Sequence, residues 1–111
     1  MDGIVIFRAS YKDKSFAYNE DFPKLSDEID SAIAKIVLDA AHTAAAIAEI
    51  VFYEDQITLE IRAEEGDFNF DEIEARFISN EILSEYEEFF ETLHKMYIVA
   101  FEEGEEYAFG C

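Results

Sequence analysis

Residues 26–50 read SDEIDSAIAKIVLDAAHTAAAIAEI and contain neither glycine nor proline. Steps of three and four residues place their apolar side chains on two adjacent stripes of a 3.6-residue helix. These stripes consist of Ile29, Ile33, Val37, Ala40, Ala44 and Ile47, and of Ala34, Leu38, Ala41, Ala45 and Ala48. A helix that is apolar over so much of its surface is normally buried. The stretch therefore predicts one alanine-rich core helix, N-capped by Ser26, in which Ala44 and Ala45 are nearly inaccessible. Residues 51–53 fit either the last turn of this helix or a short strand.

Short β-branched and aromatic segments on both sides of this helix predict strands. They are residues 3–9 (with Ile4, Ile6 and Arg8 on one face, and Val5 and Phe7 on the other), residues 15–18, residues 56–62 and, as a short addition, residues 68–70. In residues 56–62 the side chains alternate, with Ile57, Leu59 and Ile61 directed inward. A strand with one apolar and one polar face is typical of an antiparallel sheet that has one side in water.

The second half of the chain predicts further helices. Asp71, followed by Glu74 three positions later, resembles a capping box and opens a short helix over residues 71–78, with Ile73 and Phe77 inward. A second long helix is expected over residues 81–94, with an apolar stripe. The stripe consists of Ile82, Tyr86, Phe89, Phe90 and Leu93. Residues 96–109 fit either a hairpin or a continuation of this helix, because short apolar runs do not distinguish the two.

Together these elements predict an α+β fold. A small antiparallel sheet packs on the long alanine-rich core helix, and additional acidic helices lie alongside. With 111 residues the chain is long enough for one core, so a single domain over residues 1–111 is expected.

The charge of the chain is the feature that bears on function. It has 27 acidic and 8 basic residues, for a formal net charge of −19. The excess is uneven, since residues 1–53 hold nine acids and five bases, whereas residues 54–111 hold eighteen acids and three bases. Because nucleic acids and anionic membranes attract basic surfaces, direct binding to either is disfavoured. We expect partners that are cations or proteins with basic surfaces.

Motifs for catalysis, metal binding or cofactor binding are weak in this sequence. His42 and His94 have no second histidine or cysteine at zinc-site spacing. Residues 67–71 begin like a calcium loop, but Glu72 and Ile78 occupy the positions that require glycine and a bidentate glutamate. No glycine-rich phosphate loop or nucleophile elbow is present. We expect no enzyme activity, no metal and no cofactor.

Acidic clusters are the best candidates for a functional site. They consist of Glu81, Glu85, Glu87, Glu88 and Glu91 on the second long helix, of Glu64, Glu65 and Asp67 in a turn, and of Glu102, Glu103, Glu105 and Glu106 near the end. Carboxylates four residues apart rise about 6 Å along a helix, and DNA presents a phosphate about every 3.4 Å per strand. A row of glutamates can therefore approximate a row of phosphates. Tyr86 and Tyr107 are candidate aromatic anchors beside these acids.

The sequence thus predicts a small acidic protein that binds and inhibits a protein with a basic, nucleic-acid-binding or nuclease-type surface. Nucleic-acid mimics, immunity proteins and phage-encoded inhibitors offer an analogy in size and composition. The alternative is a structural or oligomerisation domain whose acidic surface is merely solvated, or adapted to high salt. The single cysteine, Cys111, and the absence of a leader-like start favour a cytoplasmic location.

Overall fold

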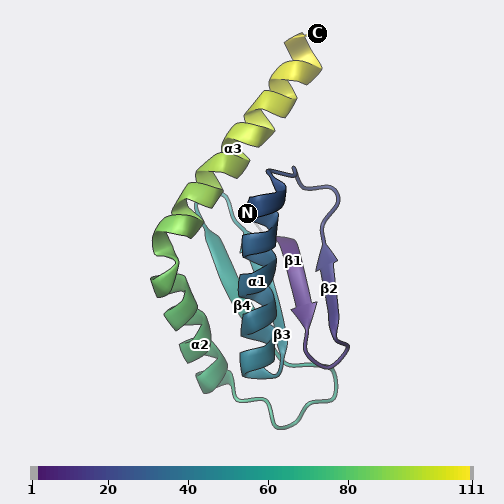
Figure 1. Cartoon of the computed structure of the whole chain (residues 1–111), viewed down its shortest axis with the longest axis vertical. Helices are drawn as coiled ribbons and strands as arrows, with labels where there is room; N and C mark the ends of the chain where they lie inside the picture. Colours follow the sequence, from purple (N-terminus) through teal and green to yellow (C-terminus); the bar gives the residue numbers. More distant parts are fainter. Residues whose placement is uncertain (1–2, 111) are drawn as a thin grey trace.

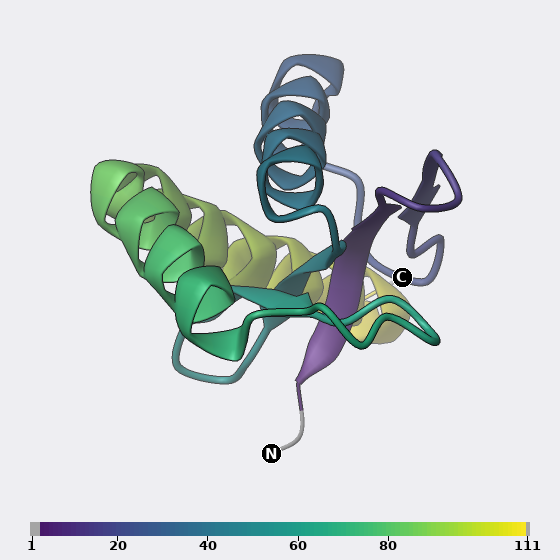
Figure 2. The ribbon, with the colours of Figure 1, turned by 90° about the horizontal axis from the view of Figure 1, so that it is seen from below.

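The structure, a computed structural model, describes residues 3–110, with the side chains of residues 3–101. Four strands form one antiparallel sheet in the order β2-β1-β3-β4, and helix α1 packs on one face of it (Figures 1 and 2). The strands are β1 (Ile4–Ser10), β2 (Ser15–Tyr18), β3 (Ile47–Phe52) and β4 (Ile57–Arg62), and the helices are α1 (Asp27–Ala44), α2 (Glu72–Glu85) and α3 (Glu87–Gly110). The predicted α+β fold is confirmed.

Helix α1 begins and ends where local hydrogen bonds allow it. The Ser26 hydroxyl accepts a hydrogen bond from the backbone N–H of Ile29, so the predicted N-cap is confirmed. At the other end Ala45 adopts a left-handed conformation, with φ at 51°, and its N–H donates to the carbonyls of Ala41 and His42. Only one face of the helix is buried. That face consists of Ile33, Ile36, Val37, Ala40 and Ala41.

Residues 45–50 are not helical, although the core helix was predicted to extend to residue 50. Residues 47–52 form β3, a central strand whose six residues are all buried between β1 and β4. Ala44 is only half-buried and Ala45 is exposed, at the point where the helix ends and the chain passes into β3; the prediction that both are inaccessible is wrong. Isoleucines and alanines suit either structure, and pairing with two distant strands decides for the strand.

Strand β1 departs from simple alternation. A register shift between Val5 and Phe7 inserts a bulge, and Ile6 and Phe7 are therefore both buried, although alternation predicted them on opposite faces. Strands β2 and β4 match the predicted segments closely, with Ile57 and Leu59 buried in β4.

The segment between β4 and α2 forms a turn and loop, so the predicted short strand at residues 68–70 is absent. Gly66 has φ at 79°, a conformation that suits glycine. Asp71 caps α2, since its Oδ1 accepts from the backbone N–H groups of Ile73 and Glu74. The helix continues past the predicted end at residue 78 as far as Glu85.

The sequence had suggested a break between two helices near Asn80. In the structure, α2 and α3 divide at Tyr86 instead. The long α3 resolves the alternative left open for residues 96–109, because the chain continues as a helix to Gly110 and extends past the end of the sheet (Figure 1). Phe90, Leu93 and Tyr97 anchor α3 in the core. The Tyr97 ring lies 4.7 Å from that of Phe22, edge to face.

Candidate functional site: an acidic helical face and its groove

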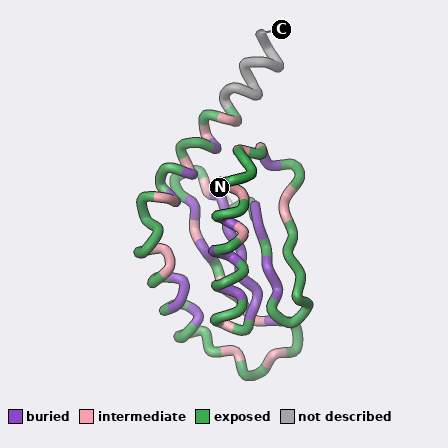
Figure 3. The backbone as a smooth tube through the Cα atoms, viewed as in Figure 1, coloured by how far each residue is buried: buried purple, intermediate pink, exposed green. Residues whose placement is uncertain are grey.

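The glutamates predicted on one long helix lie on two helices that meet at Tyr86. Glu81 and Glu85 belong to the last turns of α2, and Glu87, Glu88 and Glu91 begin α3. We call these five residues the acidic row. All five side chains are exposed, and the burial map in Figure 3 shows the two helices largely exposed along this stretch. None of the ion pairs among the described side chains involves the row.

Helix electrostatics explains only part of this row. Glu87 and Glu88 lie in the first turn of α3, where the helix dipole favours anions. Glu81 and Glu85 lie at the carboxyl end of α2, where the dipole disfavours them and no basic residue is present in the last turn. They are also four residues apart, and like charges at that spacing cost a few tenths of a kcal/mol. Among the described side chains, no ion pair joins either of these glutamates to a base.

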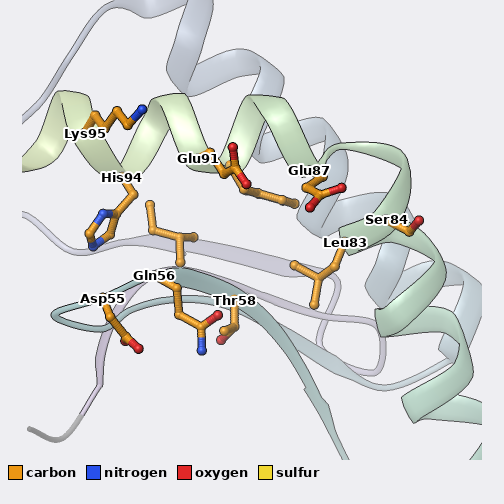
Figure 4. A pocket seen from close by; sticks show the side chains of 11 residues that line it. Asp55, Gln56, Thr58, Leu83, Ser84, Glu87, Glu91, His94 and Lys95 are labelled. Atoms are coloured by element: carbon orange, nitrogen blue, oxygen red, sulfur yellow. The ribbon is translucent and has the colours of Figure 1, made fainter.

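A groove of about 760 Å³ runs between the start of α3 and the β3–β4 connection (Figure 4). Glu87 and Glu91, one helical turn apart, line it from the α3 side, and Asp55 lies on the opposite wall. Leu83, Ile57 and Phe90 supply apolar surface, while Gln56, Thr58, Ser84, His94 and Lys95 complete the lining. Carboxylates beside apolar surface, as Glu87 and Glu91 are here, can bind a guanidinium or ammonium group on a hydrophobic stem.

His94 has a structural role at the end of this groove. Its Nε2 lies 2.9 Å from the carbonyl oxygen of Tyr53, and its ring stacks on Phe52 with centroids 5.0 Å apart. A carbonyl can only accept, so Nε2 carries the proton in this contact. The side chain therefore holds α3 against the β3–β4 turn and orients the groove wall.

The acids in the predicted turn cluster have different surroundings. Glu64 is buried, and its Oε1 accepts a hydrogen bond of 2.6 Å from the Ser10 hydroxyl and one of 3.1 Å from the Lys12 backbone N–H. Burial alone would raise the pKa of this carboxyl, but those hydrogen bonds, together with the charge of Lys12 and the Tyr11 backbone, outweigh it and lower the pKa below its usual value. Glu64 therefore ties the loop after β4 to the β1–β2 turn, and it lies outside the exposed acidic surface.

The other two acids of that turn remain accessible to different degrees. Glu65 is exposed, and its backbone carbonyl accepts a hydrogen bond from the Lys12 ammonium. Asp67 is half-buried and accepts a hydrogen bond from the backbone N–H of Asn69. Tyr86, predicted both in the apolar stripe and as an anchor, is exposed at the junction of the two helices. The side chains of Glu102, Glu103, Glu105, Glu106 and Tyr107 lie outside the described residues.

A protein-family model described as "Family of unknown function (DUF6145)" matches residues 3–106, which include the whole acidic row and the groove. The chain belongs to this family. No curated protein and no solved structure shows a significant match to this chain.

Two further findings concern the described residues of this family member. No helix among them combines the length and the apolarity needed to cross a membrane. Over the same residues, histidine, cysteine and acidic side chains do not gather in any group of three or more that could hold a metal ion.

Sequence reasoning missed several residues of the site. Asp55, Gln56 and Thr58 come from a segment distant in sequence, and only the packing of α3 against the β3–β4 connection brings them to the groove. A signal was available for the α3 wall, because residues 87, 91 and 95 recur every four positions and so share one side of a helix. Glu49 was also missed; it is buried in β3 and pairs with Arg8 and Arg62.

Proposed function

We propose that this protein binds a protein with a basic, nucleic-acid-binding or nuclease-type surface and inhibits it by presenting carboxylates in place of phosphates. The observation that carries the proposal is the exposed acidic row at the α2–α3 junction, none of whose carboxylates takes part in an ion pair among the described side chains. A cytoplasmic location is part of the same proposal, since such partners act there.

The mechanism has two stages. The net charge of −19 first attracts the basic partner over long distances and speeds the encounter. Arginine or lysine side chains then dock on the row, and one of them enters the groove beside Glu87 and Glu91. Inside the groove an arginine can bond a carboxylate through two parallel hydrogen bonds, which makes that contact stronger than one on the open surface.

The alternative, an acidic surface that is only solvated, explains the total charge but not the placement of its charges. Solubility depends on net charge and so tolerates acids at any exposed position. Placing Glu81 and Glu85 at the unfavourable end of α2 has a stability cost that solubility alone does not require.

The test is capture of basic proteins from a lysate of the source cells on the immobilised chain, followed by elution with duplex DNA. Three proteins are compared: the wild type, the row variant Glu85→Lys/Glu88→Lys, and the control variant Glu20→Lys/Asp39→Lys. The control changes two exposed acids outside the row and has the same net charge as the row variant.

We expect a protein that is retained by wild type and control, lost with the row variant, and displaced by DNA. The purified chain should also block DNA binding by that protein in a gel-shift assay. Equal retention by the two variants, or retention that DNA does not disturb, would contradict the proposal.

A further inference from the structure

Helix α2 has a second apolar face that nothing in the described chain covers. Its inner face packs Ala75 and Ile78 into the fold. On the outer side Ile73 is 84% exposed and Phe77 is 68% exposed, although the sequence predicted both inward. Phe68, in the loop that leads into the helix, is 98% exposed. Large side chains exposed together on one element are uncommon and mark interaction surfaces.

The outer face is fixed in place and cannot turn inward. The Ser79 hydroxyl donates to the carbonyl oxygen of Leu59 in β4, and Asp71 caps the amino end of the helix. Turning Ile73 and Phe77 inward would expose Ile78 instead and break the Ser79 bond. The apolar pair is therefore a rigid ridge, since residues four apart lie one above the other on a helix.

The surroundings of the ridge indicate what can cover it. Glu74 and Glu81 are exposed beside the pair, and Glu72 lies in the same first turn as Glu74. A second copy of the chain would bring another charge of −19 against these acids, which opposes self-association. An anionic membrane is repelled for the same reason. Arg76 is the one exposed base in this helix.

We propose that the outer face of α2 docks a basic amphipathic helix of the partner protein. The apolar stripe of that helix packs on Ile73 and Phe77, and its flanking lysines and arginines reach Glu74 and Glu81. Recognition of this kind uses anchors spaced three and four residues apart. The inference rests on the proposed function and deepens it, because the partner must then present apolar side chains between its bases, which a plain phosphate-binding surface does not need.

The test uses three synthetic peptides of equal positive charge, in fluorescence anisotropy titrations. The first is a leucine–lysine helix with its leucines in one stripe, the second has the same composition with the stripe scrambled, and the third is oligolysine. The main variant is Ile73→Gln/Phe77→Gln, which keeps the charge and does not lower the helix propensity. Its matched control is Leu38→Gln, a change at a 44% exposed leucine on α1, and thermal melts confirm that both fold.

We expect the striped peptide to bind wild type more tightly than the scrambled one. The ridge variant should lose about tenfold or more of that affinity and bind oligolysine as before, while Leu38→Gln changes neither. Equal binding of the striped and scrambled peptides, or no loss in the ridge variant, overturns the inference and leaves the acidic row untouched.

Two other outcomes are distinguishable. If oligolysine does not bind to the wild type, the result counts against the proposed electrostatic function itself. Dimers of wild type in sedimentation velocity that dissociate in the ridge variant would show that a second copy covers the face, which overturns the assignment of a basic helix.

Discussion

The carboxylates at the sheet and those at the α2–α3 junction differ in what surrounds them. Glu49 and Glu64 are buried and bonded to groups of the same chain, namely two arginines in one case and Ser10 with Lys12 in the other. The five glutamates of the acidic row are exposed, and no described base pairs with them. The acids of this chain therefore fall into two sets, one bonded within the fold and one open to solvent.

Among the substitutions that test this comparison, the largest effect on the free energy of unfolding is expected at Glu64. Glu64→Ala leaves the Ser10 hydroxyl and the Lys12 backbone N–H without their acceptor and should cost about 1–3 kcal/mol of unfolding free energy. Glu64→Gln, which keeps an acceptor oxygen, should cost less. Urea unfolding of both variants measures the difference, and an alanine variant as stable as wild type would show that Glu64 is not structural.

The acid dependence of stability should follow from the same residue. Because the folded state holds the pKa of Glu64 below its ordinary value of 4.5, the stability that Glu64 contributes is present above that pH. The contribution is lost as the pH falls from about 4.5 through the lower, folded-state pKa. Thermal melts from pH 6 to pH 3 should therefore show a smaller acid loss in Glu64→Gln than in wild type; parallel profiles would count against this.

The pH dependence of stability that Asp30 contributes should have the opposite sign to that of Glu64. Burial raises its pKa, with Asp27 adding to the effect and Lys24 opposing it, and its Oδ1 has no hydrogen-bond partner among the described residues. A raised folded-state pKa means that stability is gained as the pH falls through it toward the unfolded value. Asp30→Asn should thus stabilise the protein at pH 7 by about 1 kcal/mol or less. The variant should also lack the rise in stability that Asp30 contributes as the pH falls. A destabilised variant at pH 7 would indicate a bond to the carboxylate.

The smallest effect on stability is expected in the acidic row. Glu81→Gln/Glu85→Gln removes two like charges four residues apart at the unfavourable end of α2, so stability should rise by a few tenths of a kcal/mol. Chemical denaturation at low salt, where such repulsion is least screened, is the suitable measurement. A clear loss of stability would place these glutamates with Glu64 as structural residues and remove the contrast.

Most of the fold was predictable from sequence because local signals were strong. Ser26 and Asp71 identified two helix starts through their caps, and the alternation in residues 56–62 identified β4. Residues 47–50 of strand β3 were missed, because they continue a helical stripe and only pairing with β1 and β4 makes them a strand. The face of α2 was reversed for a related reason: contacts with the rest of the fold bury Ala75 and Ile78, and they leave Ile73 and Phe77 exposed.

The candidate site was predictable in composition but not in arrangement. The acidic row could be named from charge counts, whereas the helix break at Tyr86 and the burial of Glu64 depend on contacts with distant residues. The groove depends in the same way on packing between α3 and the β3–β4 connection. Such contacts leave no local pattern in the chain.

The most direct test of the outward role of the acidic row is a kinetic one. Association of the protein recovered by DNA-displaceable capture is measured at low and physiological salt with wild type, Glu85→Lys/Glu88→Lys and the equally charged control Glu20→Lys/Asp39→Lys. We expect the row variant to associate about tenfold or more slowly than the control at low salt, with wild type losing rate steeply as salt is added. Equal rates for the two variants would contradict the account, because net charge and not the row would then govern binding.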